Sequence, residues 1–183
     1  MSASVHKSPA ERARDIRCVI FDIDGVITDC KLYLGPDGLE LKAVNVRDGL
    51  GIKLLLKAGI EVAVISGRPS PAMKARFEYL GVKYVWLDVE EKIPAYESLL
   101  ATLALTDAQV AMMGDDVPDL PLMQRVGLAL TTADAHPKAH EAAHWTSHLN
   151  GGNGAVREAV DFILAVQSEA RGSAIDLRVG AGS

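Results

Sequence analysis

The chain has 183 residues, 49% of them hydrophobic, and a formal net charge of −5 at pH 7. This length and apolar content suit one domain with a single sizeable core, not two full domains. The lysine and arginine residues are scattered and form no basic stripe, which argues against nucleic-acid binding. No apolar run reaches membrane-spanning length. We therefore expect a cytoplasmic protein that binds neither nucleic acid nor membranes.

Short apolar runs alternate with longer amphipathic stretches, which is typical of a mostly parallel sheet with helices on both faces. This order predicts a three-layer, Rossmann-like α/β fold. The predicted strands lie at 18–22, 61–66, 83–87, 109–114 and 127–130. The predicted helices lie at 49–58, 70–80, 91–103 and 117–126, with a last one from a glycine-rich turn at 151–154 to about 167.

The domain is expected to cover residues 15–168, between a flexible segment at 1–14 and a flexible, small and polar tail at 169–183. Within it, segment 32–45 interrupts the alternation of strands and helices. Two extended runs there flank the turn Gly35-Pro36-Asp37-Gly38. The pattern predicts a β-hairpin that projects from the sheet.

Two carboxylates, Asp22 and Asp24, follow the first predicted strand and lead into Gly25. Side chains repeat with period two along a strand, so both acids are expected on one side, where a turn at Gly25 folds over what they hold. A carboxylate at the end of a buried strand is unfavourable unless a charged group binds it there. The arrangement favours a magnesium site with a nucleophile, although an Asp-rich turn that caps the next segment explains the same pattern.

Further polar groups follow the other predicted strands. Ser66 and Arg68 follow the second, Lys92 begins the helix after the third, and Asp115 and Asp119 follow the fourth. In open α/β sheets ligands bind beyond the carboxyl ends of the strands, so these groups are expected to converge. Taken singly, each also fits a helix cap, a solvated lysine or a turn.

The order Asp-x-Asp-Gly, Ser, Lys and Gly-Asp-x-x-x-Asp resembles the haloacid dehalogenase superfamily of aspartate-nucleophile phosphohydrolases. The resemblance implies that Asp22 is the nucleophile, that Asp24 is the general acid and base, and that Ser66 and Lys92 hold the phosphoryl group. It also implies a Mg²⁺ ion held by the following set of residues: the Asp22 carboxylate, the Asp24 backbone carbonyl and Asp115, with Asp119 in support.

Members of this superfamily commonly carry a cap domain in one of two intervals of the chain. Here neither 29–66 nor 66–92 has room for one, so we expect a capless protein with an open site. An open site excludes water poorly and selects small substrates poorly. The expectation is therefore a homo-oligomer in which a neighbouring subunit covers the active site.

Longer stretches are similar to the capless branch that hydrolyses 3-deoxy-D-manno-octulosonate 8-phosphate (KDO 8-phosphate), a tetrameric branch of lipopolysaccharide biosynthesis. They are FDIDGVITD, LKAVNVRDGLGIK, ISGR, GDDVPDLPLM, ADAHP and GGNGAVREAV. The resemblance implies substrate contacts by Asp24, Asn45, Val46, Arg47, Asp48, Gly49, Lys53, Ser66, Arg68, Arg76 and Lys92. Position 53 is usually arginine in this branch, and lysine there loses bidentate geometry. Related enzymes act on nine-carbon, sialic-type sugar acid 9-phosphates, and the motifs leave this alternative open.

The sequence is also compatible with two functions other than a phosphatase. His140-Glu141-Ala142-Ala143-His144 matches the H-E-x-x-H zinc signature, but Pro137 allows only a short helix there. The second is a non-catalytic oligomeric scaffold that keeps the fold. The intact residues Asp22, Asp24, Lys92 and Asp115 argue against it.

Overall fold

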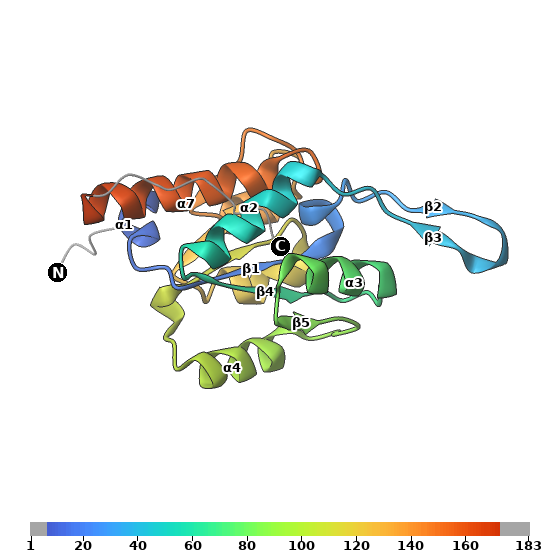
Figure 1. Ribbon diagram of the computed structural model, residues 1–183, viewed down its shortest axis with the longest axis horizontal. Helices are drawn as coiled ribbons and strands as arrows, with labels where there is room; N and C mark the ends of the chain where they lie inside the picture. Colours follow the sequence, from blue (N-terminus) through green and yellow to red (C-terminus); the bar gives the residue numbers. More distant parts are fainter. Residues whose placement is uncertain (1–6, 173–183) are drawn as a thin grey trace, which may run out of the picture.

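The computed structural model describes residues 7–172 and is built around a parallel six-stranded sheet (Figure 1). Its strand order is β5-β4-β1-β6-β7-β8. The strands are β1 (Cys18–Phe21), β4 (Glu61–Ile65), β5 (Tyr84–Trp86), β6 (Val110–Met113), β7 (Leu128–Thr131) and β8 (Trp145–Thr146). The predicted three-layer, Rossmann-like α/β class is confirmed, with β8 as an additional short edge strand.

Successive side chains along each strand point to opposite faces of the sheet, so the core forms two layers. Val19 and Phe21 of β1 pack on one face, with Val62 and Val64 of β4. The intervening Cys18 and Ile20 pack on the other. Both faces are covered, and the central strands β1 and β6 accordingly consist of buried apolar residues throughout.

Helices cover both faces of the sheet. α1 (Pro9–Ala13), α2 (Val46–Lys57), α3 (Pro71–Leu80) and α7 (Ala155–Arg171) contribute to the first layer. α4 (Lys92–Leu103), α5 (Leu120–Met123) and α6 (Pro137–Ala142) contribute to the second. Every helix within 7–172 is too short or too polar to span a bilayer.

Several boundaries differ from the sequence prediction; the helix predicted at 49–58, for example, begins at Val46. The expected helix at 117–126 is split into a 3-10 turn, Val117–Asp119, and α5, since Pro118 and Pro121 are tolerated only where a turn begins. Helix α1 lies in the segment expected to be flexible, where Ser8 caps it. Helix α7 continues to Arg171, past the predicted domain end. The remaining expectations for the two termini concern 1–6 and 173–183, which lie outside the described residues.

The segment after β1 forms two short antiparallel strands, β2 (Tyr33–Leu34) and β3 (Glu40–Leu41), joined through a 3-10 turn at Pro36–Gly38. The pair extends away from the sheet, at the right of Figure 1. From β1 to β4 the described chain thus contains only the loop after β1, this hairpin and α2, as a capless chain requires.

Candidate active site

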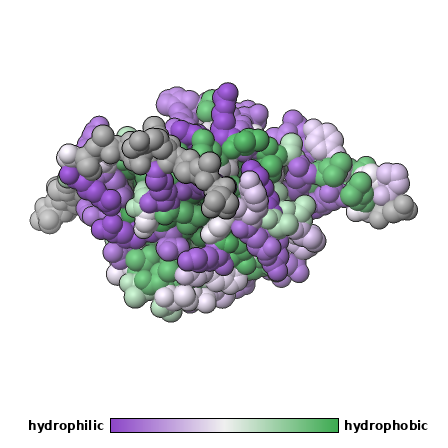
Figure 2. All heavy atoms as spheres, viewed as in Figure 1, coloured by the Kyte–Doolittle hydropathy of each residue, from purple (hydrophilic) through white to green (hydrophobic). Residues whose placement is uncertain are grey.

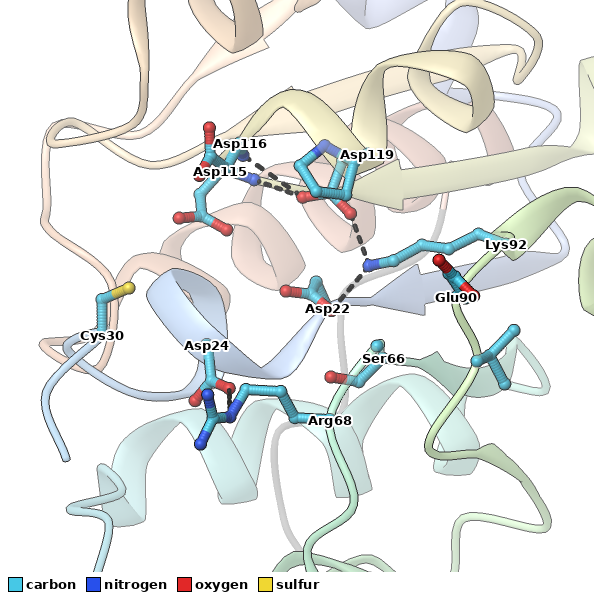
Figure 3. Close-up of a pocket in the computed structure, with 13 residues that line it drawn as sticks. Asp22, Asp24, Cys30, Ser66, Arg68, Glu90, Lys92, Asp115, Asp116 and Asp119 are labelled. Carbon is cyan, nitrogen blue, oxygen red and sulfur yellow. Dashed lines mark hydrogen bonds and ion pairs between the residues drawn. The ribbon is translucent and has the colours of Figure 1, made fainter. Parts of the chain in front are cut away.

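The predicted strand-end residues line one pocket of about 240 Å³ at the carboxyl edge of the sheet (Figure 3). Its lining includes Asp22, Asp24, Ser66, Arg68, Lys92, Asp115 and Asp119, together with Cys30, Glu90 and Asp116. Loops that follow β1, β4, β5 and β6 supply these side chains. The predicted convergence of four separate motifs is therefore observed.

Lys92 joins two of the carboxylates. Its Nζ lies 2.7 Å from Asp22 Oδ1 and 2.6 Å from Asp119 Oδ1, and its side chain is 5% exposed. The other oxygen of Asp119 accepts hydrogen bonds from the backbone N–H groups of Asp115 and Asp116. Asp119 thereby fixes both the lysine and the loop after β6.

Asp22, Asp115 and Asp119 each offer a carboxylate oxygen, and these oxygens lie within 4.8 Å of one another. Hard oxygen ligands at this spacing suit Mg²⁺. Three carboxylates with one ammonium leave two negative charges, which a divalent cation neutralises. The residues present therefore fit the magnesium ion that the sequence predicts.

The crowding of acids changes the proton affinity of the cluster. Burial, followed by the nearby Asp119 carboxylate, raises the pKa of Asp22 to about 6, although Lys92 opposes the shift. Burial and the neighbouring Asp119 and Asp22 carboxylates raise the pKa of Asp115 to about 8. Burial disfavours the charged form of Lys92, but Asp22 and Asp119 outweigh it and raise its pKa. A bound divalent cation would favour the ionised form of these acids and so allow them to share one small volume.

Asp24 lies at the side of the pocket, and its carboxylate is paired with Lys42. Lys42 Nζ is 2.7 Å from Asp24 Oδ1 and 2.9 Å from Oδ2. Lys42 was not predicted from the sequence. The alternation of Glu40 and Lys42 along the predicted hairpin indicates that the two side chains share one face, but it does not identify their partner.

The predicted substrate residues at the start of α2 have structural partners. Asn45 caps the helix by accepting the N–H of Arg47, and the Val46 and Arg47 side chains are exposed. Asp48 is 1% exposed, and its carboxylate accepts the N–H groups of Gly154 and Arg157 at the start of α7. None of these residues lines the main pocket, so their substrate contacts stay predictions.

Two more predicted cations lie along α2 and α3. Lys53 Nζ lies 4.6 Å from the ring centroid of Tyr79, and the Arg76 guanidinium lies 5.5 Å from it. Arg76 packs closely against Gly49, where a Cβ atom would lie 2.7 Å from its Nη2. Arg76 also lines a second pocket, of about 180 Å³, together with Lys42 and Ser70.

The histidines of the H-E-x-x-H sequence do not form a common helical face. Helix α6 ends at Ala142, before His144 is reached. His144 Nδ1 accepts the N–H of Ala129 in β7. Within the described part of the chain, the acids at 22, 115 and 119 form the sole group of three or more side chains spaced to hold a metal.

The chain is similar in sequence and fold to known proteins. Residues 90–159 match the family of haloacid dehalogenase-like hydrolases, the class that the fold and the acidic pocket define. The chain is 45% identical over 163 residues to the 3-deoxy-D-manno-octulosonate 8-phosphate phosphatase of Yersinia pestis, covering 89% of this chain and 87% of that protein. It therefore belongs to the family of KDO 8-phosphate phosphatases.

Solved structures agree with this assignment. The crystal structure of the Yersinia pestis phosphatase has a TM-score of 0.86 and 44% identity, covering 91% of this chain and 90% of that one. The Moraxella catarrhalis phosphatase, crystallised with a magnesium ion, a phosphate ion and a KDO molecule, has a TM-score of 0.86 and 30% identity. The match covers 90% of this chain and 94% of that one.

Proposed function

We propose that the protein is a Mg²⁺-dependent phosphatase that hydrolyses KDO 8-phosphate to KDO and phosphate. The observation that carries this proposal is the cluster of Asp22, Asp115 and Asp119 around Lys92, in a chain that is 45% identical to such an enzyme. A bound Mg²⁺ ion would be held by the Asp22 and Asp115 carboxylates and the Asp24 backbone carbonyl, with Asp119 in support. It would offset the negative charge of the phosphate and of its attacker.

Asp22 is the nucleophile of the proposed reaction. One of its oxygens attacks phosphorus, and the bond from phosphorus to the sugar oxygen breaks. Asp24, which must carry a proton once the anionic substrate is bound, donates that proton to the leaving oxygen, so an alcohol departs and an aspartyl phosphate remains. The Asp24 carboxylate then takes a proton from water as the water oxygen attacks phosphorus, and phosphate leaves from a restored Asp22 carboxylate.

Lys92 and Ser66 are proposed to hold the transferring phosphoryl group. Both side chains are buried at the pocket floor, next to Asp22 (Figure 3). An ammonium fixed in a site that is buried from water stabilises developing negative charge more strongly than one exposed to solvent. Because two carboxylates already orient Lys92, little reorganisation is needed when the phosphate arrives.

The rest of the substrate carries a second negative group, the sugar-acid carboxylate. Arg68 lies at the mouth of the pocket and is half exposed. We propose that Arg68 and the residues at 45–49, 53 and 76 recognise the sugar acid, since the resemblance implies these positions and they include several cations.

We also propose a cytoplasmic homotetramer in which a neighbouring subunit covers the site. The hairpin supports this, because Tyr33, Leu34, Leu39 and Leu41 are 54% to 77% exposed. Hydrophobic residues on it are visible at the right of Figure 2. Exposed apolar side chains grouped on a projecting element are typical of an interface. Light scattering after gel filtration measures the mass, and a monomer would contradict the tetramer. Cell fractionation tests the location.

The test of function is phosphate release from a panel of eight- and nine-carbon sugar-acid phosphates with saturating Mg²⁺, compared by kcat/KM. The proposal expects KDO 8-phosphate to give the highest ratio and Asp22→Asn to abolish turnover with the fold intact. A higher ratio for a nine-carbon 9-phosphate would reassign the substrate. A wild-type protein inactive on every phosphate, p-nitrophenyl phosphate included, would favour the scaffold.

A further inference from the structure

Lys42 is a buried cation that the catalytic scheme above leaves without a role. It follows β3 at the base of the hairpin, and its side chain is 5% exposed. Its ammonium reaches both oxygens of Asp24, at 2.7 and 2.9 Å. An ammonium is rarely buried to this degree unless its partner is fixed as well.

Glu40 and Arg68 extend this pair into a closed ring of four charges. Lys42 Nζ is 3.6 Å from Glu40 Oε1, and Arg68 Nη2 is 3.1 Å from Glu40 Oε2. Arg68 Nε closes the ring, 3.7 Å from Asp24 Oδ2. The ring contains two positive and two negative groups and links the hairpin to the loops after β1 and β4.

The two cations of the ring differ in their exposure to solvent and in how closely they contact Asp24. The Arg68 side chain is 53% exposed and contacts Asp24 at the longest distance in the ring, whereas Lys42 is enclosed. An incoming anion competes for an exposed guanidinium at low cost, because such ion pairs are weak in water. It competes poorly for a buried ammonium that contacts two carboxylates.

We propose that Lys42 is a positioning residue that holds the Asp24 carboxyl group in place for proton transfer, while Arg68 leaves the ring to bind the anionic substrate. This inference rests on the proposed function, in which Asp24 is the acid and base. With Lys42 removed, Asp24 keeps a hydrogen bond from Thr28 Oγ1 at 3.3 Å and the distant Arg68 contact. Its carboxyl group is then free to rotate away from the reacting oxygen.

The first experiment compares Lys42→Met with wild type on KDO 8-phosphate. A displaced acid slows chemistry and leaves binding intact, so kcat is expected to fall about 10²-fold while KM and the Mg²⁺ dissociation constant stay within about twofold. Lys31→Met is the matched control, because Lys31 also pairs with an aspartate, at 3.2 Å, but is 69% exposed. It is expected to match wild type. Arg68→Met is expected to raise KM by about tenfold or more.

The second experiment uses the leaving group to separate positioning from a general structural effect. p-Nitrophenolate departs without a proton, whereas a sugar alkoxide requires one. With enzyme in excess, Lys42→Met is expected to release p-nitrophenolate from p-nitrophenyl phosphate at close to the wild-type rate but to cleave KDO 8-phosphate slowly. Equal slowing of both substrates, or a change in KM alone, would overturn the role of Lys42.

Lys42→Arg is measured in the same way, which keeps the test decisive if the methionine variant does not fold. It retains the charge with altered donor geometry, so an intermediate kcat with the same leaving-group pattern is expected. Wild-type kinetics in a folded Lys42 variant would refute this inference and leave the proposed function standing. An inactive wild-type enzyme would instead refute the proposed function.

Discussion

Gly25 and Asp115 approach each other so closely that a Cβ atom at position 25 would overlap the Asp115 carboxylate. Gly25 also has a φ of +84°, in the left-handed region that glycine adopts without strain. The loop after β1 and the loop after β6 therefore meet at a point where no other side chain fits. The spacing of the acidic cluster depends on this contact.

Gly25→Ala is expected to displace Asp115 and to lower kcat/KM by about 10²-fold or more, with weaker Mg²⁺ binding. Titration calorimetry with Mg²⁺ and steady-state kinetics measure the two effects. Gly59→Ala is the matched control, since Gly59 has a φ of +77° and nothing within 4 Å of the added atom. It should lose only stability, and a Gly25→Ala enzyme with normal Mg²⁺ affinity would contradict the argument.

Magnesium binding is expected to depend on pH through Asp22 and Asp115. Their pKa values are raised to about 6 and about 8, so protons compete with the cation below these values. The Mg²⁺ dissociation constant should fall as pH rises from 6 to 8 and level off above. Proton release measured by calorimetry in buffers of different ionisation enthalpy checks this. A constant affinity over that range would contradict it.

The same shifts predict the stability of the metal-free protein. A carboxyl group whose folded pKa lies above its unfolded value favours folding when protonated, and this stabilisation is lost as pH rises through the folded value. The Tm of metal-free protein should therefore fall between pH 6 and pH 8.5, and saturating Mg²⁺ should reduce the fall. Calorimetric scans with and without Mg²⁺ measure it, and a Tm that rises over this range would be inconsistent with the shifts.

Lys92→Met is expected to lower kcat by about 10²- to 10³-fold, because it removes the fixed charge beside the transferring phosphate. Mg²⁺ binding should persist, since the carboxylates at 22 and 115 remain. Calorimetry and kinetics on the same preparation separate the two effects. Lys74→Met, on an exposed position of α3, serves as the control. Loss of Mg²⁺ binding would mean that Lys92 acts by holding the ligands together.

The strand-end motifs could be predicted from sequence because they follow from topology. Once β1, β4, β5 and β6 are parallel neighbours, whatever follows them meets at one edge, as Asp22, Ser66 and Lys92 do. The contact between Lys42 and Asp24 depends instead on how the hairpin leans against the sheet. No local pattern sets that angle, so the sequence predicts the hairpin but does not identify Lys42 as the partner of Asp24.

Asp48 illustrates a second limit. The resemblance implies a substrate contact for Asp48, which stays a prediction. Its carboxylate accepts the N–H groups of Gly154 and Arg157, which lie more than 100 positions further along the chain. Sequence patterns describe neighbours along an element and not the packing of α2 against α7. The split helix at 117–126 has a local cause, because both of its prolines are visible in the sequence.

Asp48→Ala is expected to lower the free energy of unfolding by about 1.5–3 kcal/mol, since it leaves buried N–H groups without a charged acceptor. Asp161→Ala is its matched control. Asp161 also pairs with Arg157, but through an i,i+4 surface contact that contributes about 0.5 kcal/mol or less. Urea unfolding measures both. Equal losses would show that Asp48 contributes no more than a surface pair.

His144 separates a structural histidine from a zinc ligand. Its Nδ1 accepts the N–H of Ala129, which is fully buried in β7, at 2.9 Å. His144→Ala is therefore expected to destabilise the protein by about 1–3 kcal/mol, with kcat per folded molecule unchanged. His140→Ala, in the same sequence motif, is the matched control. If the H-E-x-x-H sequence bound a catalytic zinc ion, both variants would be inactive, and Zn²⁺ instead of Mg²⁺ would restore chelator-treated wild type.

The pH dependence of stability gives an independent measurement on His144. Burial lowers the pKa of His144, so its neutral form, which alone accepts the Ala129 N–H, is favoured in the folded state. This stabilisation is complete above the unfolded pKa of about 6.5 and is lost as pH falls through the lower folded value. The urea midpoint of wild type should therefore decrease toward acidic pH more steeply than that of His144→Ala. Parallel curves for the two proteins would contradict the hydrogen bond to β7.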